Sequence, residues 1–341
     1  MDETKGIKKG YQMEENLRNY FLEMGYFVVR GVKYNFKDTE GTDIDLFLYN
    51  RPTILSRERI NVDIKNKKTP QAMERIFVAK GLQSILGFDK CIVATKDNRD
   101  TIKEFANIHD VIILDGFLLN KISSRINRDR FTEEELFEEI SKDSLGKLSG
   151  DWRAIIENMK SSLLDKFDYS GCINSLESTK YFIEQCITNP KRKEISCRCS
   201  FLLISFFLIK LDFILKDVAF LENDIKQRKI TNGFKYGNLG ETGMRKFINI
   251  AKQLIPENQA INLNNQIQTL YNSIPVNIIS EYYTKNDVSK NLFKNAKEFE
   301  KLAYSKNFRS PNILDNELKS ILSISLDYFG IERKSFFDIF E

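Results

Sequence analysis

Two short stretches with apolar side chains at every second position, residues 43–49 and 61–65, constrain this 341-residue chain more than any other feature. An alternation with a period of two is typical of strands that are buried on one face. The polar stretch between them, residues 50–59, is short enough for the two strands to pair as an antiparallel hairpin. The sequence therefore predicts two neighbouring strands near the centre of a sheet.

Three charged residues of this hairpin are predicted to converge on one side of the sheet: Asp45, Asp63 and Lys65. Hard cations such as Mg²⁺ take oxygen ligands, usually one or two carboxylates together with waters and substrate phosphate. Asp45 and Asp63 would supply the carboxylates, and a bound metal lowers the pKa of its water. The ammonium of Lys65 would orient that water and neutralise the developing charge. The pattern predicts a metal-dependent phosphodiesterase, with a solvated strand face as the alternative.

The order Asp, spacer, Asp-Ile-Lys resembles the PD-(D/E)XK motif of the restriction-endonuclease-like nucleases, and Gly-Thr-Asp-Ile-Asp at residues 41–45 is similar to the Mrr-like branch. Two departures from the motif are that no Pro precedes Asp45 and that Asp63 stands where Glu is commoner. The resemblance implies a catalytic set of Asp45, Asp63, Lys65 and one acidic residue of an opening helix. It also implies Mg²⁺ as the cofactor, with Mn²⁺ able to substitute, and Asp45 and Asp63 as its ligands.

Further segments resemble the same fold over residues 8–120. Residues 10–29 are similar to its opening helix, which assigns the acidic residue to Glu14, with Glu15 as the fallback. Residues 87–97 and 108–116 resemble its last two core strands. The predicted fold class is α/β, with a restriction-endonuclease-like core of a mixed central sheet flanked by helices.

Basic and polar residues near the predicted site are candidates for binding nucleic acid. A basic collar beside an acidic metal site would suit a phosphate backbone, and a solvated hairpin loop is the alternative. On the helix predicted to end at Gly87, the resemblance implies a polar side chain that faces the substrate, and a solvent-facing role is equally open. The candidates are Arg57, Lys67, Lys68, Lys80 and Gln83.

Composition excludes several classes of protein. The single histidine excludes HNH, HD and zinc-hydrolase chemistry that needs several histidines, and no GxxxxGK[ST] phosphate loop is present. Five cysteines without a CxxC pair indicate reduced thiols in a cytoplasm, and the charged N-terminus shows no signal peptide. The most apolar run, residues 201–209, is shorter than the roughly 20 residues of a membrane span. We therefore expect a cytoplasmic protein without a membrane partner.

Beyond residue 120 the pattern becomes helical, so the sequence predicts a nuclease-like domain over residues 1–120 and an all-α domain of recognition, regulation or oligomerisation over residues 121–341. The glycine-rich stretch 231–243 is predicted to be a loop between helices. The apolar run 201–209 must be covered on every side. Either the domain covers it internally, or Phe206 and Phe207 form a two-fold dimer contact.

The expected function is a Mg²⁺-dependent endonuclease that hydrolyses double-stranded DNA in restriction or antiphage defence. Three alternatives remain open. The first is a nucleic-acid-binding module, the second a nuclease subunit activated by a partner protein from the same defence operon, and the third an RNA nuclease. A homodimer would supply the two active sites that cutting both strands requires.

Overall fold

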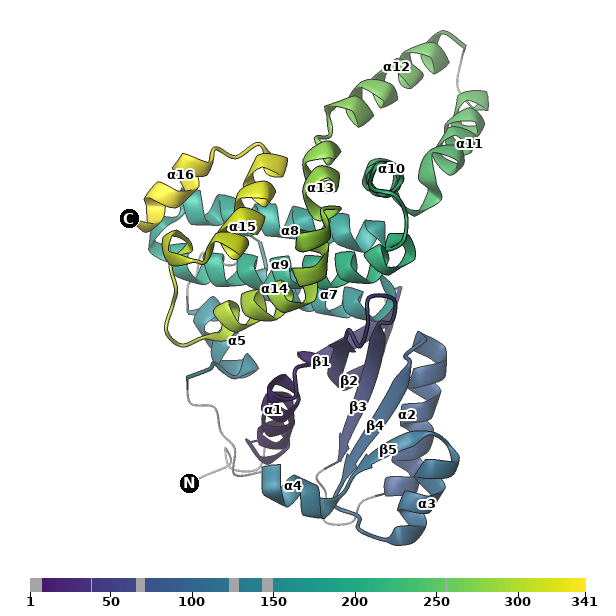
Figure 1. The fold of residues 1–341 in the computed structure, drawn as a ribbon, viewed down its shortest axis with the longest axis vertical. Coiled ribbons are helices and arrows are strands. Elements are labelled where there is room, and N and C mark those ends of the chain that lie inside the picture. Colours follow the sequence, from purple (N-terminus) through teal and green to yellow (C-terminus); the bar gives the residue numbers. More distant parts are fainter. Residues whose placement is uncertain (1–7, 38, 66–70, 123–128, 143–149, 255–256) are drawn as a thin grey trace. The chain divides into compact units, whose positions relative to one another are not determined.

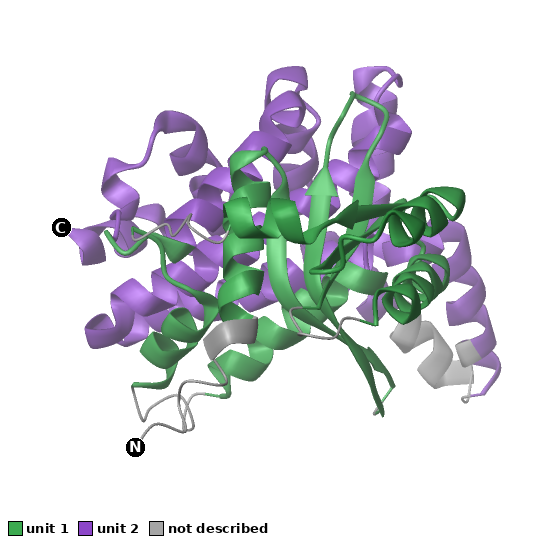
Figure 2. Ribbon diagram, turned by 90° about the horizontal axis from the view of Figure 1, so that it is seen from below, with its two compact units in different colours: residues 1–165, 304–307 green, residues 166–303, 308–341 purple. Residues whose placement is uncertain are grey.

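The computed structural model describes residues 8–37, 39–65, 71–122, 129–142, 150–254 and 257–341. The chain forms two compact units, coloured separately in Figure 2. Unit 1 comprises residues 1–165 and 304–307, and unit 2 comprises residues 166–303 and 308–341. Over the described ranges, every helix is too short or too polar to span a bilayer.

Unit 1 is built on a five-stranded mixed sheet whose strands lie side by side in chain order (Figure 1). The first two pairings are antiparallel and the last two are parallel. Parallel neighbours need a crossover, and a helix provides each one. The strands are β1 (Phe27–Phe36), β2 (Thr39–Asn50), β3 (Glu58–Lys65), β4 (Lys90–Thr95) and β5 (Val111–Leu114).

Helices cover both faces of this sheet. The apolar faces of α1 (Lys8–Glu23) and α4 (Gly116–Ile122) pack on one side, and α2 (Ala72–Leu86) and α3 (Asp100–Ile108) pack on the other. Alternate residues of the central strands enter the two cores, as the period of a strand requires. An α/β architecture with a mixed sheet is therefore confirmed.

The predicted hairpin is confirmed as well: β2 pairs antiparallel with β3, and Leu46 lies opposite Val62. The predicted domain boundary at residue 120 falls within α4. Unit 1 continues through α5 (Glu133–Ser141) and α7 (Trp152–Asp165), because α7 packs against β1 and the Glu133 amide donates to Glu15 Oε1 at 3.1 Å.

The described elements of unit 2 are helices arranged around α9 (Lys193–Leu215). Residues 201–209 of α9 are each at most 1% exposed. The ring of Phe207 contacts Phe234 and Tyr283, with ring centroids 6.4 and 5.5 Å apart. Internal cover of this run is thus confirmed. The alternative of a dimer contact through Phe206 and Phe207 is wrong, because both side chains are fully buried within one chain.

Two further corrections concern helices that the sequence pattern did not predict. The glycine-rich stretch expected to form a loop is mostly helical, since α10 ends at Tyr236 and α11 begins at Gly240. Gly233 lies inside α10 because a Cβ there would come within 2.1 Å of the Tyr169 ring. The glycine therefore permits close packing rather than a turn.

The helix α13 was also missed. The remaining elements of unit 2 follow its neighbours in chain order. They are α8 (Tyr169–Thr188), α10 (Asn223–Tyr236), α11 (Gly240–Gln253), α12 (Glu257–Ser273), α13 (Val276–Tyr283), α14 (Asn286–Tyr304), α15 (Asn316–Phe329) and α16 (Arg333–Phe337).

Candidate functional site

Asp45 lies in β2 at the point where the pairing with β3 ends. Its Oδ2 accepts a hydrogen bond of 2.5 Å from the Ile64 amide, which fixes the carboxylate beside β3. Burial raises the pKa of Asp45, against the lowering effects of the Ile64 amide, Arg75 and Lys65. The structure therefore brings Asp45 and Lys65 into electrostatic contact, as the hairpin pattern predicted.

Asp63 has a different environment. Its side chain is buried, and both carboxylate oxygens accept from the Arg75 guanidinium of α2, with Nε 2.7 Å from Oδ2 and Nη2 paired with Oδ1. Sequence reasoning missed this pair, because the arginine belongs to a different element from the strand. In the described arrangement, Asp63 is neutralised by α2.

The two acidic residues of α1 are held in opposite ways. Burial raises the pKa of Glu14 to about 7, with Asp45 adding to the rise and Arg30 acting against it. Burial also acts to raise the pKa of Glu15, but Arg18 and Arg30 hold it below its ordinary value. Because Asp45 affects Glu14, the structure associates Glu14 rather than the fallback Glu15 with the Asp45 carboxylate.

Arg30 connects α1 to α5 and was not predicted from the sequence. Its Nε donates to Glu14 Oε2 at 2.9 Å, and its Nη1 donates to Glu15 Oε1 at 2.6 Å and to Glu134 Oε2 at 2.9 Å. The Arg30 side chain is nearly fully buried. A sequence signal was available, because a charged residue interrupts the apolar run Phe-Val-Val-Arg of β1.

A cavity of about 470 Å³ opens within unit 1, and Glu14 and Asp45 line it together with residues of β1, α5 and α7. Asp63 and Lys65 are not among its lining residues. In the described ranges, no group of three or more acidic, cysteine or histidine side chains is arranged to hold a metal ion. Mg²⁺ needs only one or two protein carboxylates, so the Glu14–Asp45 pair fits it, whereas Asp63 is occupied by Arg75.

Arg57, a predicted nucleic-acid ligand, stabilises the hairpin loop. It is 7% exposed, and its Nη1 donates to the carbonyl oxygens of Thr53, Ile54 and Ser56 at 2.9, 3.0 and 3.0 Å. These contacts use the guanidinium structurally, and its role in nucleic-acid binding stays a prediction. Lys67 and Lys68 lie outside the described residues.

Gln83 also makes structural contacts on α2. Its Nε2 donates to the Asp89 carbonyl at 3.0 Å, and its Oε1 accepts from Cys91 Sγ at 3.2 Å. Lys80 is half-buried and lowers the pKa of the same thiol, against the larger effect of burial. Both residues therefore face β4, and substrate contact by either stays a prediction.

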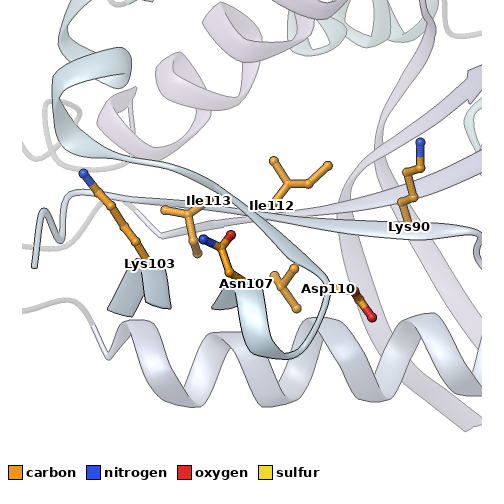
Figure 3. Close-up of a pocket in the computed structure, with 7 residues that line it drawn as sticks. Lys90, Lys103, Asn107, Asp110, Ile112 and Ile113 are labelled. Carbon is orange, nitrogen blue, oxygen red and sulfur yellow. The ribbon is translucent and has the colours of Figure 1, made fainter. Parts of the chain in front are cut away.

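A second cavity in unit 1, of about 520 Å³, lies along the edge strand β5. Figure 3 shows its side chains, with Lys103 and Lys90 at opposite ends of the strand. Lys90 is paired with Glu58 at 2.7 Å and Lys103 with Asp115 at 2.8 Å. None of the predicted site residues lines this cavity.

Comparisons of the chain with protein-family models, with curated proteins and with solved structures gave no match. Functional argument therefore depends on the chemistry of the residues themselves. The feature with the clearest chemistry is the pair of incompletely neutralised carboxylates at Glu14 and Asp45.

Proposed function

We propose that this chain is a Mg²⁺-dependent nuclease that hydrolyses phosphodiester bonds of DNA, with residues 1–120 forming a restriction-endonuclease-like core followed by an all-α domain. The observation that carries the proposal is the proximity of Glu14 and Asp45. Burial raises the pKa of both carboxyl groups, and Lys65 lies within electrostatic reach of Asp45. Perturbed acidic residues of this kind are typical of functional sites.

In this proposal the Glu14 and Asp45 carboxylates hold the ion, which when bound supplies a more acidic water and stabilises negative charge on phosphate. The ammonium of Lys65 orients the attacking water and neutralises charge in the transition state. Asp63 joins the ligand set only when Arg75 releases one of its oxygens, since both now accept from the guanidinium. Mn²⁺ would substitute for Mg²⁺, because both take oxygen ligands.

A nuclease subunit activated by a partner is the second candidate. The pairing of Asp63 with Arg75 favours it, because a carboxylate that is neutralised in the free chain is available only after a rearrangement. A partner protein or the nucleic acid itself would have to favour that rearranged state. RNA as the substrate and a binding module without catalysis remain alternatives to cleavage of DNA.

Cleavage of plasmid DNA by the purified chain in Mg²⁺ tests the proposal. Asp45→Asn removes a charged ligand without changing its size, and we expect the rate to fall about 100-fold or more. Glu40→Gln is the matched control, because Glu40 is an exposed acidic residue of the same strand and does not line the cavity. Equal cleavage by Asp45→Asn and Glu40→Gln would overturn the proposed site.

A second experiment separates chemistry from binding. Lys65→Ala should lower the cleavage rate and leave DNA affinity, measured by fluorescence anisotropy in Ca²⁺, within about twofold of the wild type, because Lys65 acts on the transition state. A parallel loss of rate and affinity would identify Lys65 as a phosphate-binding residue instead.

A further inference from the structure

Glu133, at the first position of α5, presents an unpaired carboxylate oxygen to the cavity of unit 1. The residue is 7% exposed. Its Oε1 accepts from the Nζ of Lys160, which is itself 2% exposed. Its Oε2 is buried and has no hydrogen-bond partner among the described residues.

An ionised oxygen that is removed from water without a partner is costly, because its desolvation is not offset. The surrounding backbone does not compensate for it. The Glu133 amide donates to Glu15, and the capping box of α5 is completed by Thr132 and Glu135. The remaining acceptor on Glu133 therefore needs a partner from the cavity.

The balance of charge in the cavity indicates what that partner is. Seven carboxyl groups and four basic side chains are found among its described lining residues. The four basic groups are already paired: Lys160 with Glu133, Arg30 with Glu14, Arg153 with Glu157 at 2.8 Å, and Lys33 with Glu40 at 3.7 Å. Positive charge for Oε2 has to be supplied from outside the protein.

We propose that Glu133 Oε2 is a protein ligand of a second divalent cation, which binds separately from the ion assigned to Glu14 and Asp45. Waters and an incoming phosphate complete its coordination, since the described residues offer no preformed cage of three or more acidic, cysteine or histidine ligands. The ion offsets the carboxylate excess of the cavity, which would otherwise repel a polyanion. Lys160 on Oε1 holds the carboxylate in position for it.

Counting bound Mn²⁺ by electron paramagnetic resonance on the purified full-length chain tests this inference without any activity. We expect two competitively displaceable ions per wild-type chain, with Mg²⁺ as the competitor. Glu133→Gln should retain one ion, and Asp45→Asn should retain the other. Glu138→Gln is the matched control on the same helix and cavity, and it should retain both.

Two ions in Glu133→Gln would overturn the inference, as would loss of an ion in Glu138→Gln with none lost in Glu133→Gln. Two ions in Asp45→Asn and one in Glu133→Gln would overturn the ion assigned in the proposed function and support the Glu133 site. Circular dichroism checks folding. If Glu133→Gln does not fold, Glu133→Asp keeps the charge but shortens the side chain, and its affinity for one ion should fall about tenfold. Unchanged affinity for both ions would then overturn the inference.

Discussion

Buried charge is treated differently in the two units. In unit 2, Lys210 of α9 is fully buried, and its ammonium donates to the Gly171 carbonyl at 3.2 Å and to Ser175 Oγ at 2.9 Å. In unit 1, Glu14 and Glu133 are buried or half-buried with their negative charge incompletely matched. The comparison teaches that a satisfied buried charge joins two helices, whereas an unmatched one marks a place for a ligand.

The largest expected effect lies in the helical core of unit 2. Phe207→Ala should lower the free energy of unfolding by about 3–5 kcal/mol, because it leaves a cavity between α9, α10 and α13. Phe220→Ala, at a side chain that is 78% exposed, should stay within about 0.5 kcal/mol. Urea denaturation measures both. Similar values for the two variants would contradict the description of α9 as an internal core helix.

A pH effect should distinguish the cavity of unit 1 from that core. Burial raises the pKa of Glu14 from 4.5 to about 7, so the folded state binds the proton more tightly than the unfolded state. Stability from this group is complete below pH 4.5 and is lost as the pH rises through 7, by at most about 3 kcal/mol. Urea denaturation at several pH values should show this loss in the wild type and a shallower one in Glu14→Gln. An equal slope in both would exclude Glu14 as its source.

Opposite signs are expected when one charge is removed from each unit. Lys210→Met should destabilise the chain by about 1–3 kcal/mol, because Ser175 and the Gly171 carbonyl lose their donor. Asp45→Asn should raise the melting temperature in EDTA, because burial disfavours the ionised carboxyl group. Thermal melts followed by circular dichroism decide this. Destabilisation by both changes would remove the distinction between the two regions.

The smallest effect concerns the backbone beside the cavity. Gly31 of β1 has φ +57°, and a Cβ there would lie 3.9 Å from both Glu133 Oε1 and Lys160 Nζ. Gly31→Ala should cost about 1–2 kcal/mol through backbone strain alone. Gly81→Ala in α2, where a Cβ would meet nothing within 4 Å, should instead stabilise by up to about 1 kcal/mol. Chemical denaturation of the two variants provides the check.

The sequence by itself determined the features that repeat along a short segment. Alternation over residues 43–49 and 61–65 predicted the β2–β3 hairpin, and the uniformly apolar run 201–209 predicted a fully covered helix. The α/β class followed in the same way. Local periodicity suffices because the direction of each side chain is set by the backbone geometry of its own element.

Only the tertiary structure decided which charges are neutralised. Arg75 pairs with Asp63 across 12 positions of the chain, and Arg30 pairs with Glu134 across 104. The same packing gives the neighbours Glu14 and Glu15 opposite pKa shifts, although both are glutamates on one helix. An ion pair and a burial depend on distances between elements, and a one-dimensional pattern of residue types does not contain those distances.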